Sequence, residues 1–189
     1  SALNKAALLL PDDPRPIANQ LSIHKEIGDW SSANKLLKSL PRNLREAGQV
    51  RGAAADLLMA QQLMSEAERE FAHLCGIDPE QPLHWLNRAA CLRNLKHTVA
   101  ATRIAKQGLS LHPNHYKLKL AVGQNLAELG KQKEALPLLL EKEKATDKSI
   151  SQQHLFSLQF LGAGYGLIRA PERAAMAKSW EEDVEKEGI

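Results

Sequence analysis

The sequence predicts an all-α protein in which consecutive helix pairs stack into a right-handed helix-turn-helix solenoid. Four alanines recur at a constant spacing of 34 residues, and they are Ala33, Ala67, Ala101 and Ala135. A fixed period of this length is typical of repeat proteins, in which each unit is one supersecondary element. Apolar residues within a period follow a helical spacing, and no stretch alternates as a strand would. Aromatic residues make up only 4% of the chain, which favours closely packed helices over a β-sandwich.

The overall composition excludes several classes of protein. The 189 residues are 43% hydrophobic and 25% charged, as in a folded protein rather than a disordered one. A formal net charge of +3 is too small to indicate nucleic-acid binding, so we expect no nucleic-acid partner. No apolar run approaches the roughly 20 residues of a membrane span, and the chain does not start with the pattern of a signal peptide. We therefore expect a protein that does not bind membranes. Two cysteines are too few for a disulfide scaffold, so we expect the reducing cytoplasm as its compartment.

The 34-residue period divides most of the chain into complete two-helix units. These units are placed at 14–47, 48–81, 82–115 and 116–149. Residues 1–13 have the pattern of the end of a truncated preceding repeat, so we expect the chain to be a fragment of a longer protein. Residues 150–189 depart from the period, because Arg169 stands where a fifth alanine would fall. We expect this C-terminal part to form a separate helix pair.

Glycines and prolines mark the ends of the expected helices. Gly28 and Gly130 are three periods apart and lie in the turns of the first and last units. Pro79 and Pro113 are one period apart and end the second helices of their units, because proline cannot continue a helix interior.

The second helix of unit 48–81 has a clear apolar face. Its apolar residues are spaced to lie on one side of a helix, and they are Met64, Ala67, Phe71 and Leu74. Ser65 precedes Glu68 by three residues, which is the spacing of a capping box. The pattern predicts that Ser65 caps this helix.

The period and its residues resemble the tetratricopeptide repeat (TPR). Ala67, Phe71 and Pro79 match the alanine, phenylalanine and proline of that repeat in the second unit. The third unit matches it at Trp85, Ala89, Leu92, Ala101 and Pro113. The resemblance implies a solenoid whose inner surface binds proteins or peptides. It also implies that small residues such as Ala89 and Gly123 lie where the two helices of a unit approach most closely.

The C-terminal segment 150–189 has two interpretations. Pro171 begins its last helix, and the simpler interpretation is a cap with a polar outer side, which a solenoid requires. The alternative is a linker to a missing domain. The series Leu155–Leu161, then Pro171 and Trp180, is similar to the segment that joins the TPR array to the catalytic domain in bacterial SPINDLY-like O-linked N-acetylglucosamine transferases. That resemblance implies a glycosyltransferase domain beyond residue 189.

The sequence offers only weak candidates for catalytic or metal chemistry. His112 and His115 lie in an inter-unit turn with no third ligand nearby, and we interpret them as a solvent-exposed pair. Cys75 and Cys91 are expected to be buried free thiols. No nucleophile–base pair is recognisable, so we expect no catalytic residue, metal or cofactor in this chain.

Candidate binding residues lie on the first helices of the units, which line the inner groove of TPR arrays. They fall at the fifth, sixth and ninth positions of the units, and they are Asn19, Asp56, Leu86, Asn87, Leu120 and Gln124. The resemblance to the glycosyltransferases implies that Asn19 and Asn87 bind an extended peptide backbone, because an amide offers both donors and an acceptor. We expect both amides to be free. Leu86 and Leu120 stand where clamps for a C-terminal carboxylate carry lysine, so they favour a partly apolar peptide or helix.

These observations predict a non-catalytic TPR scaffold for protein or peptide binding. The alternative function is substrate recruitment for a protein O-glycosyltransferase whose catalytic domain follows this chain. A third interpretation is a self-associating assembly module, and the sequence leaves the oligomeric state open.

Overall fold

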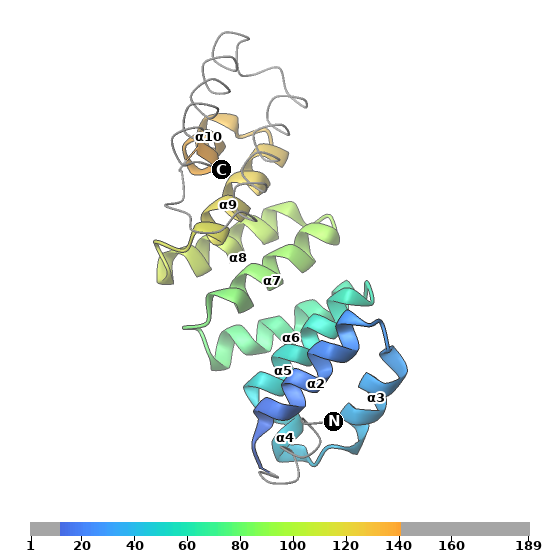
Figure 1. Ribbon diagram of the computed structural model, residues 1–189. Helices are drawn as coiled ribbons and strands as arrows, with labels where there is room; N and C mark the ends of the chain where they lie inside the picture. Colours follow the sequence, from blue (N-terminus) through green and yellow to red (C-terminus); the bar gives the residue numbers. More distant parts are fainter. Residues whose placement is uncertain (1–11, 141–189) are drawn as a thin grey trace, which may run out of the picture.

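The computed structural model describes residues 12–140, and these residues form an elongated stack of α-helices (Figure 1). The helices are α2 (Pro14–Glu26), α3 (Trp30–Ser39), α4 (Arg42–Glu46), α5 (Gly48–Ala60), α6 (Met64–Ile77), α7 (Pro82–Asn94), α8 (Thr98–Leu111), α9 (Tyr116–Glu128) and α10 (Gln132–Leu140). No strand occurs in this part of the chain. The prediction of an all-α helical solenoid is confirmed.

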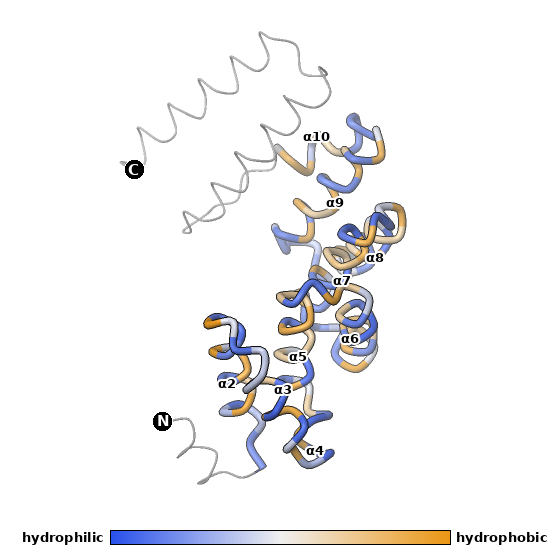
Figure 2. Tube along the Cα trace, turned by 90° about the vertical axis from the view of Figure 1, so that its right-hand side faces the viewer, coloured by the Kyte–Doolittle hydropathy of each residue, from blue (hydrophilic) through white to orange (hydrophobic). Residues whose placement is uncertain are grey.

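From α6 onward, each helix packs mainly against its neighbours in sequence. Helices α2, α5, α7 and α9 contain 13 residues each, and their first residues are 34 positions apart. Helix α6 packs against α5 and α7, α8 packs against α7 and α9, and α10 packs against α9. Figure 2 shows these helices following one another along the stack, with polar and apolar residues alternating around each of them. A solenoid held by nearest-neighbour contacts has this arrangement.

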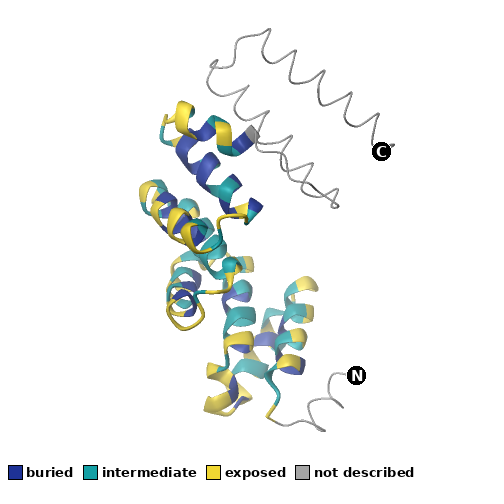
Figure 3. Cartoon of the chain, turned by 90° about the vertical axis from the view of Figure 1, so that its left-hand side faces the viewer, coloured by how far each residue is buried: buried dark blue, intermediate teal, exposed yellow. Residues whose placement is uncertain are grey.

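The alanine series lies at the centre of the stack. Its members are all fully buried, at 0% exposure, and they are Ala33, Ala67, Ala101 and Ala135. Figure 3 shows that buried residues gather where helices meet, whereas the turns are exposed. The 34-residue period therefore marks core positions of the stack. A larger side chain at these positions would have to displace a neighbouring helix.

Two glycines allow especially close packing between the helices of a pair. A Cβ atom on Gly123 of α9 would lie 2.8 Å from Leu139 of α10, so the small residue expected there is required. A Cβ atom on Gly108 of α8 would lie 2.5 Å from the Cβ atom of Trp85 on α7. Gly108 was not predictable as a contact position, because glycine inside a helix is not by itself a packing signal.

The first pair of helices departs from the pattern of the others. Its second helix, α3, ends at Ser39, where Leu40 is extended and Pro41 prevents the helix from continuing. The short helix α4 follows Pro41 and contributes the buried side chain of Leu44. Helix α2 packs more extensively against α5 than against α3. The region expected to be a simple helix pair thus contains three helices.

The turns confirm some of the expected helix ends and correct one of them. Gly28 and Gly130 adopt φ angles of +71° and +74°, a left-handed conformation that glycine adopts without steric cost. Ser65, however, does not cap α6. That helix begins at Met64, one residue earlier, and its N-cap residue Leu63 makes no side-chain hydrogen bond. Ser65 therefore lies inside the first turn, where it cannot act as the N-cap.

Two predicted segments lie wholly or largely outside the described residues. These are the truncated repeat at 1–13, of which residues 12 and 13 are described, and the C-terminal helix pair at 150–189. Within residues 12–140, no helix has the length and apolar character needed to cross a membrane.

Candidate functional site

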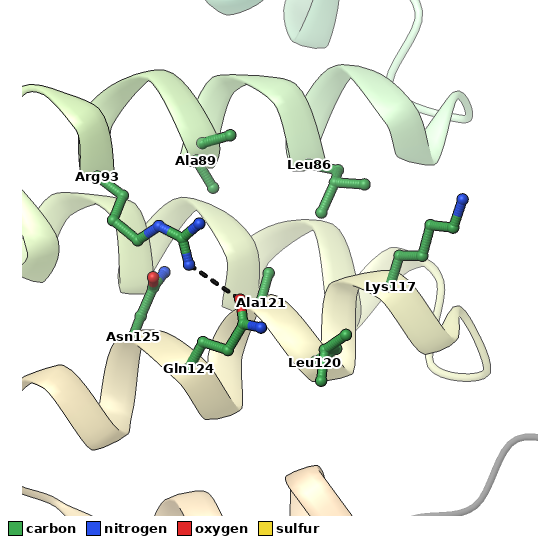
Figure 4. Close-up of a pocket in the computed structure, with 9 residues that line it drawn as sticks. Leu86, Ala89, Arg93, Lys117, Leu120, Ala121, Gln124 and Asn125 are labelled. Atoms are coloured by element: carbon green, nitrogen blue, oxygen red, sulfur yellow. Dashed lines mark hydrogen bonds between the residues drawn. The ribbon is translucent and has the colours of Figure 1, made fainter. Parts of the chain in front are cut away.

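A pocket of about 320 Å³ lies between α7 and α9, the first helices of two successive pairs (Figure 4). Its lining residues are Leu86, Ala89, Ala90, Arg93, Lys117, Leu120, Ala121, Gln124 and Asn125. The two helices contact each other directly as well as through α8. The alanines leave space between the helices because their side chains end at Cβ. Leu86 and Leu120 supply larger apolar groups, and they occupy equivalent positions one period apart.

One end of the pocket is polar and tightly organised. Arg93 donates a hydrogen bond from Nη1 to Oε1 of Gln124 over 2.9 Å. Asn125 lies beside this pair in Figure 4, and the residue is only 2% exposed. Its amide is not a fully buried group without a partner, because Nδ1 of His24 is the one buried side-chain atom within residues 12–140 that lacks a hydrogen bond. The amide of Asn125 therefore carries no large desolvation cost.

The pocket also carries two positive charges without carboxylate partners. Neither Arg93 nor Lys117 forms an ion pair with a residue in the range 12–140. Gln124 accepts a hydrogen bond from the guanidinium of Arg93. Because Gln124 is neutral, the positive charge of Arg93 stays uncompensated. Lys117 belongs to the first turn of α9, and Figure 4 shows it at the opposite end of the pocket from Arg93. The pocket therefore has a cation at each end and an apolar middle.

The structure brings three of the six candidate binding residues together. Leu86, Leu120 and Gln124 line the pocket between α7 and α9. Asp56 and Asn87 meet elsewhere, between α5 and α7, and Asn19 is exposed on α2. The candidates thus occupy three separate places along the stack.

The environment of Asn87 corrects the expectation that its amide is free. Its Nδ2 atom donates a hydrogen bond to Oδ1 of Asp56 over 3.0 Å. Burial raises the pKa of Asp56, although Lys25, His84 and the bond from Asn87 oppose that rise. The Asp56 carboxylate needs the Asn87 amide as a hydrogen-bond donor, because burial removes the carboxylate from water. Asn87 is consequently committed to Asp56 and has less capacity for an incoming peptide than we expected.

Three pocket residues were not anticipated from the sequence, namely Arg93, Lys117 and Asn125. A helical-phase argument identifies Arg93, which lies seven residues after Leu86 and therefore on the same face of α7. Asn125 gives no such signal, because an asparagine near the end of a helix is ordinarily exposed.

The two cysteines are buried and free, as expected. Burial raises the pKa of each thiol to about 11, so both are protonated at neutral pH. Cys91 packs in a core cluster with Ala55 and Phe71, where it serves as a small apolar residue. Protonated buried thiols are poor nucleophiles, which gives these cysteines a structural role.

The two histidines of the turn before α9 are not simply exposed. Nε2 of His112 lies 3.2 Å from the carbonyl oxygen of Pro79, which belongs to the turn between α6 and α7. Nδ1 of His115 accepts a hydrogen bond from the backbone N–H of Leu118 over 3.3 Å and caps α9. Burial lowers the pKa of His115. The histidines thus stabilise the turn and the helix start, and no group of three or more potential metal ligands occurs within residues 12–140.

Several solved structures share this fold at low sequence identity. YrrB, described as a TPR protein with an unusual peptide-binding site, is 18% identical, with a TM-score of 0.63, and the match covers 92% of this chain and 87% of YrrB. Human IFIT1, solved as a dimer with PPP-AAAA, is 14% identical with a TM-score of 0.70, and the match covers 84% of this chain and 39% of IFIT1. MamA from AMB-1 is 20% identical with a TM-score of 0.56, covering 73% and 85% of the two chains.

Neither a family model nor a curated protein sequence matches the chain. The structural matches nevertheless show the fold, which is the helical solenoid of TPR proteins.

Proposed function

We propose that this chain is a non-catalytic scaffold that binds a protein or extended peptide in the pocket between α7 and α9. The observation that carries the proposal is the pocket itself, which is largely apolar and has the polar side chains of Arg93, Gln124 and Asn125 at one end. A peptide unit offers both a carbonyl and an N–H, and an asparagine side chain is complementary to both. The pocket volume lies at the lower end of the range of ligand sites.

The structural neighbours support this proposal. YrrB is described as having a peptide-binding site, and it shares the solenoid architecture over most of both chains. First helices of successive pairs form the walls of the pocket here, as the TPR resemblance implies for an inner groove. We also propose that the array consists of four repeats at 14–47, 48–81, 82–115 and 116–149, since α2, α5, α7 and α9 begin 34 residues apart.

A peptide selection tests the proposed function directly. A random peptide library displayed on phage is selected against the immobilised chain, and enriched peptides are measured by fluorescence anisotropy. The double variant Ala90→Gln and Ala121→Gln places two longer side chains in the pocket and should weaken binding at least ten-fold. Ala60→Gln, at an exposed position of α5, is the matched control and should bind normally. Failure to enrich any peptide, or normal binding by the double variant, would contradict the proposal.

A second candidate function rests on the resemblance of residues 155–180 to the linker of SPINDLY-like glycosyltransferases. In that case the same scaffold recruits substrates for a catalytic domain that follows it, in the cytoplasm of a bacterium. The test is the full-length gene product, incubated with a labelled nucleotide sugar and a peptide from the selection. Sugar transfer by the wild-type protein, and its loss in the Ala90→Gln and Ala121→Gln double variant, would support this function. Absence of transfer by the wild-type protein would favour the non-catalytic scaffold.

A further inference from the structure

The charge of the described chain is distributed very unevenly between its two halves. Residues 12–81 contain eight lysines and arginines against eleven acidic residues, whereas residues 82–140 contain nine against two. The small net charge of the whole sequence therefore conceals a strongly basic half. The pocket between α7 and α9 lies in that half, so its surroundings attract negatively charged partners.

The two cations of the pocket differ from two partly buried arginines elsewhere in the stack. Arg51 and Arg88 are each paired with a glutamate, at 2.6 Å and 2.8 Å. Arg93 instead bonds a neutral amide, and Lys117 has no ion-pair partner within residues 12–140. A carboxylate is therefore the group that complements each of these two side chains.

The spacing of the cations sets the length of the partner segment. Arg93 reaches α9 at Gln124, seven residues beyond Lys117. Seven residues of α-helix span roughly 10 Å, and an extended chain covers that distance in about three residues. Leu86 and Leu120 lie between the two ends and provide an apolar surface.

From this arrangement we propose that the pocket selects an acidic peptide, in which carboxylates about three residues apart flank an apolar side chain. The carboxylates pair with Arg93 and Lys117, the apolar side chain contacts Leu86 and Leu120, and the peptide backbone bonds the amide of Asn125. This inference rests on the proposed function, because it assigns the chemical class of the peptide.

A nucleic acid is the competing class of anionic partner, and the lining of the pocket disfavours it. Single-stranded nucleic acids bind through stacking of bases on aromatic side chains as well as through cations. No aromatic side chain lines this pocket. Trp85 is engaged nearby, since its Nε1 atom donates a hydrogen bond to the carbonyl of Pro79 over 2.9 Å.

The test compares two fluorescein-labelled peptides that differ only in charge. One carries two glutamates three residues apart with a leucine between them, and the other carries glutamines at the same places. We expect the acidic peptide to bind the whole chain at least ten-fold more tightly at low salt, and to lose that advantage in 0.5 M NaCl. Equal binding of the two peptides would overturn the inference.

Charge-removing variants locate the effect on the pocket. Arg93→Gln and Lys117→Gln should each weaken binding of the acidic peptide by about two- to five-fold, as expected for partly exposed ion pairs. Binding of the neutral peptide should stay unchanged. Lys133→Gln removes an equal charge from an exposed position on α10 and should have no such effect. An equal loss in all three variants would show a diffuse field rather than a site and would contradict the inference.

The outcomes separate this inference from the proposed function. If the library selection yields pocket-binding peptides without acidic residues, the inference is wrong and the scaffold function stands. If the selection yields no peptide and neither labelled peptide binds, both are wrong. A labelled single-stranded oligoadenylate serves as the remaining probe. Tighter binding of that probe than of the acidic peptide, sensitive to Arg93→Gln, would also overturn the inference.

Discussion

Replacing Asn125 with leucine should impair the binding site and leave the fold intact. The residue is 2% exposed, but its amide is not among the buried polar atoms that lack a hydrogen-bond partner within residues 12–140. A buried polar group without any partner would cost about 1–3 kcal/mol, so removing this amide should change the free energy of unfolding by less than about 1 kcal/mol. Leucine has a similar size, and Leu120 and Ala121 line the same pocket.

Leucine also favours the helix more than asparagine does, by up to about 0.5 kcal/mol, so a control is needed. Asn34→Leu, at an exposed position of α3, carries the same change in helix propensity. Urea unfolding followed by circular dichroism should place the free energy of unfolding of Asn125→Leu within about 1 kcal/mol of this control, which corresponds to roughly 2–4 °C in Tm. The same variant should bind selected peptides several-fold more weakly, because leucine offers no hydrogen bond to a peptide unit. Normal peptide binding by this variant would refute a role for the Asn125 amide in the pocket.

Three further predictions concern the core and its ionisable groups. Ala101→Leu should destabilise the array by about 1–3 kcal/mol through overpacking of a fully buried site, and an unchanged melting curve would show that the alanine period has no packing role. Cys75 and Cys91 should react with a thiol reagent only after denaturation, because burial raises both thiol pKa values to about 11, and rapid reaction of the native protein would contradict this. Burial lowers the pKa of His84 and His115, so the folded chain binds fewer protons than the unfolded chain. The unfolding free energy should therefore fall as the pH drops from about 7 to 5, and a double glutamine variant at these positions should flatten that dependence.

The fold was largely predictable because its strongest constraint is local and repeated. Each alanine of the 34-residue series is fully buried, so the period of the packed core appears directly in the sequence. The irregular structure of the first helix pair was less predictable from the sequence. Pro41 indicates that a helix ends, but only the packing of α2 against α5 shows how little α3 then contributes.

The candidate site was only partly predictable, since repeat position indicates a face of a helix but not the partner of a side chain. Leu86, Leu120 and Gln124 were placed by position alone and do line the pocket. Asn87 occupies a comparable position, yet it bonds Asp56 on the preceding first helix. Such a pairing depends on the distance between two helices, which single positions do not encode.

The most direct test of the central claim is a nuclear magnetic resonance titration that observes the side-chain amide of Asn125. Addition of a selected peptide to the ¹⁵N-labelled chain should shift the two amide proton signals of Asn125, while those of the exposed Asn19 on α2 stay in place. The shift should disappear in the Ala90→Gln and Ala121→Gln double variant. A bound peptide that shifts the amide of Asn19 and leaves Asn125 unaffected would contradict the assignment of the pocket between α7 and α9 as the binding site.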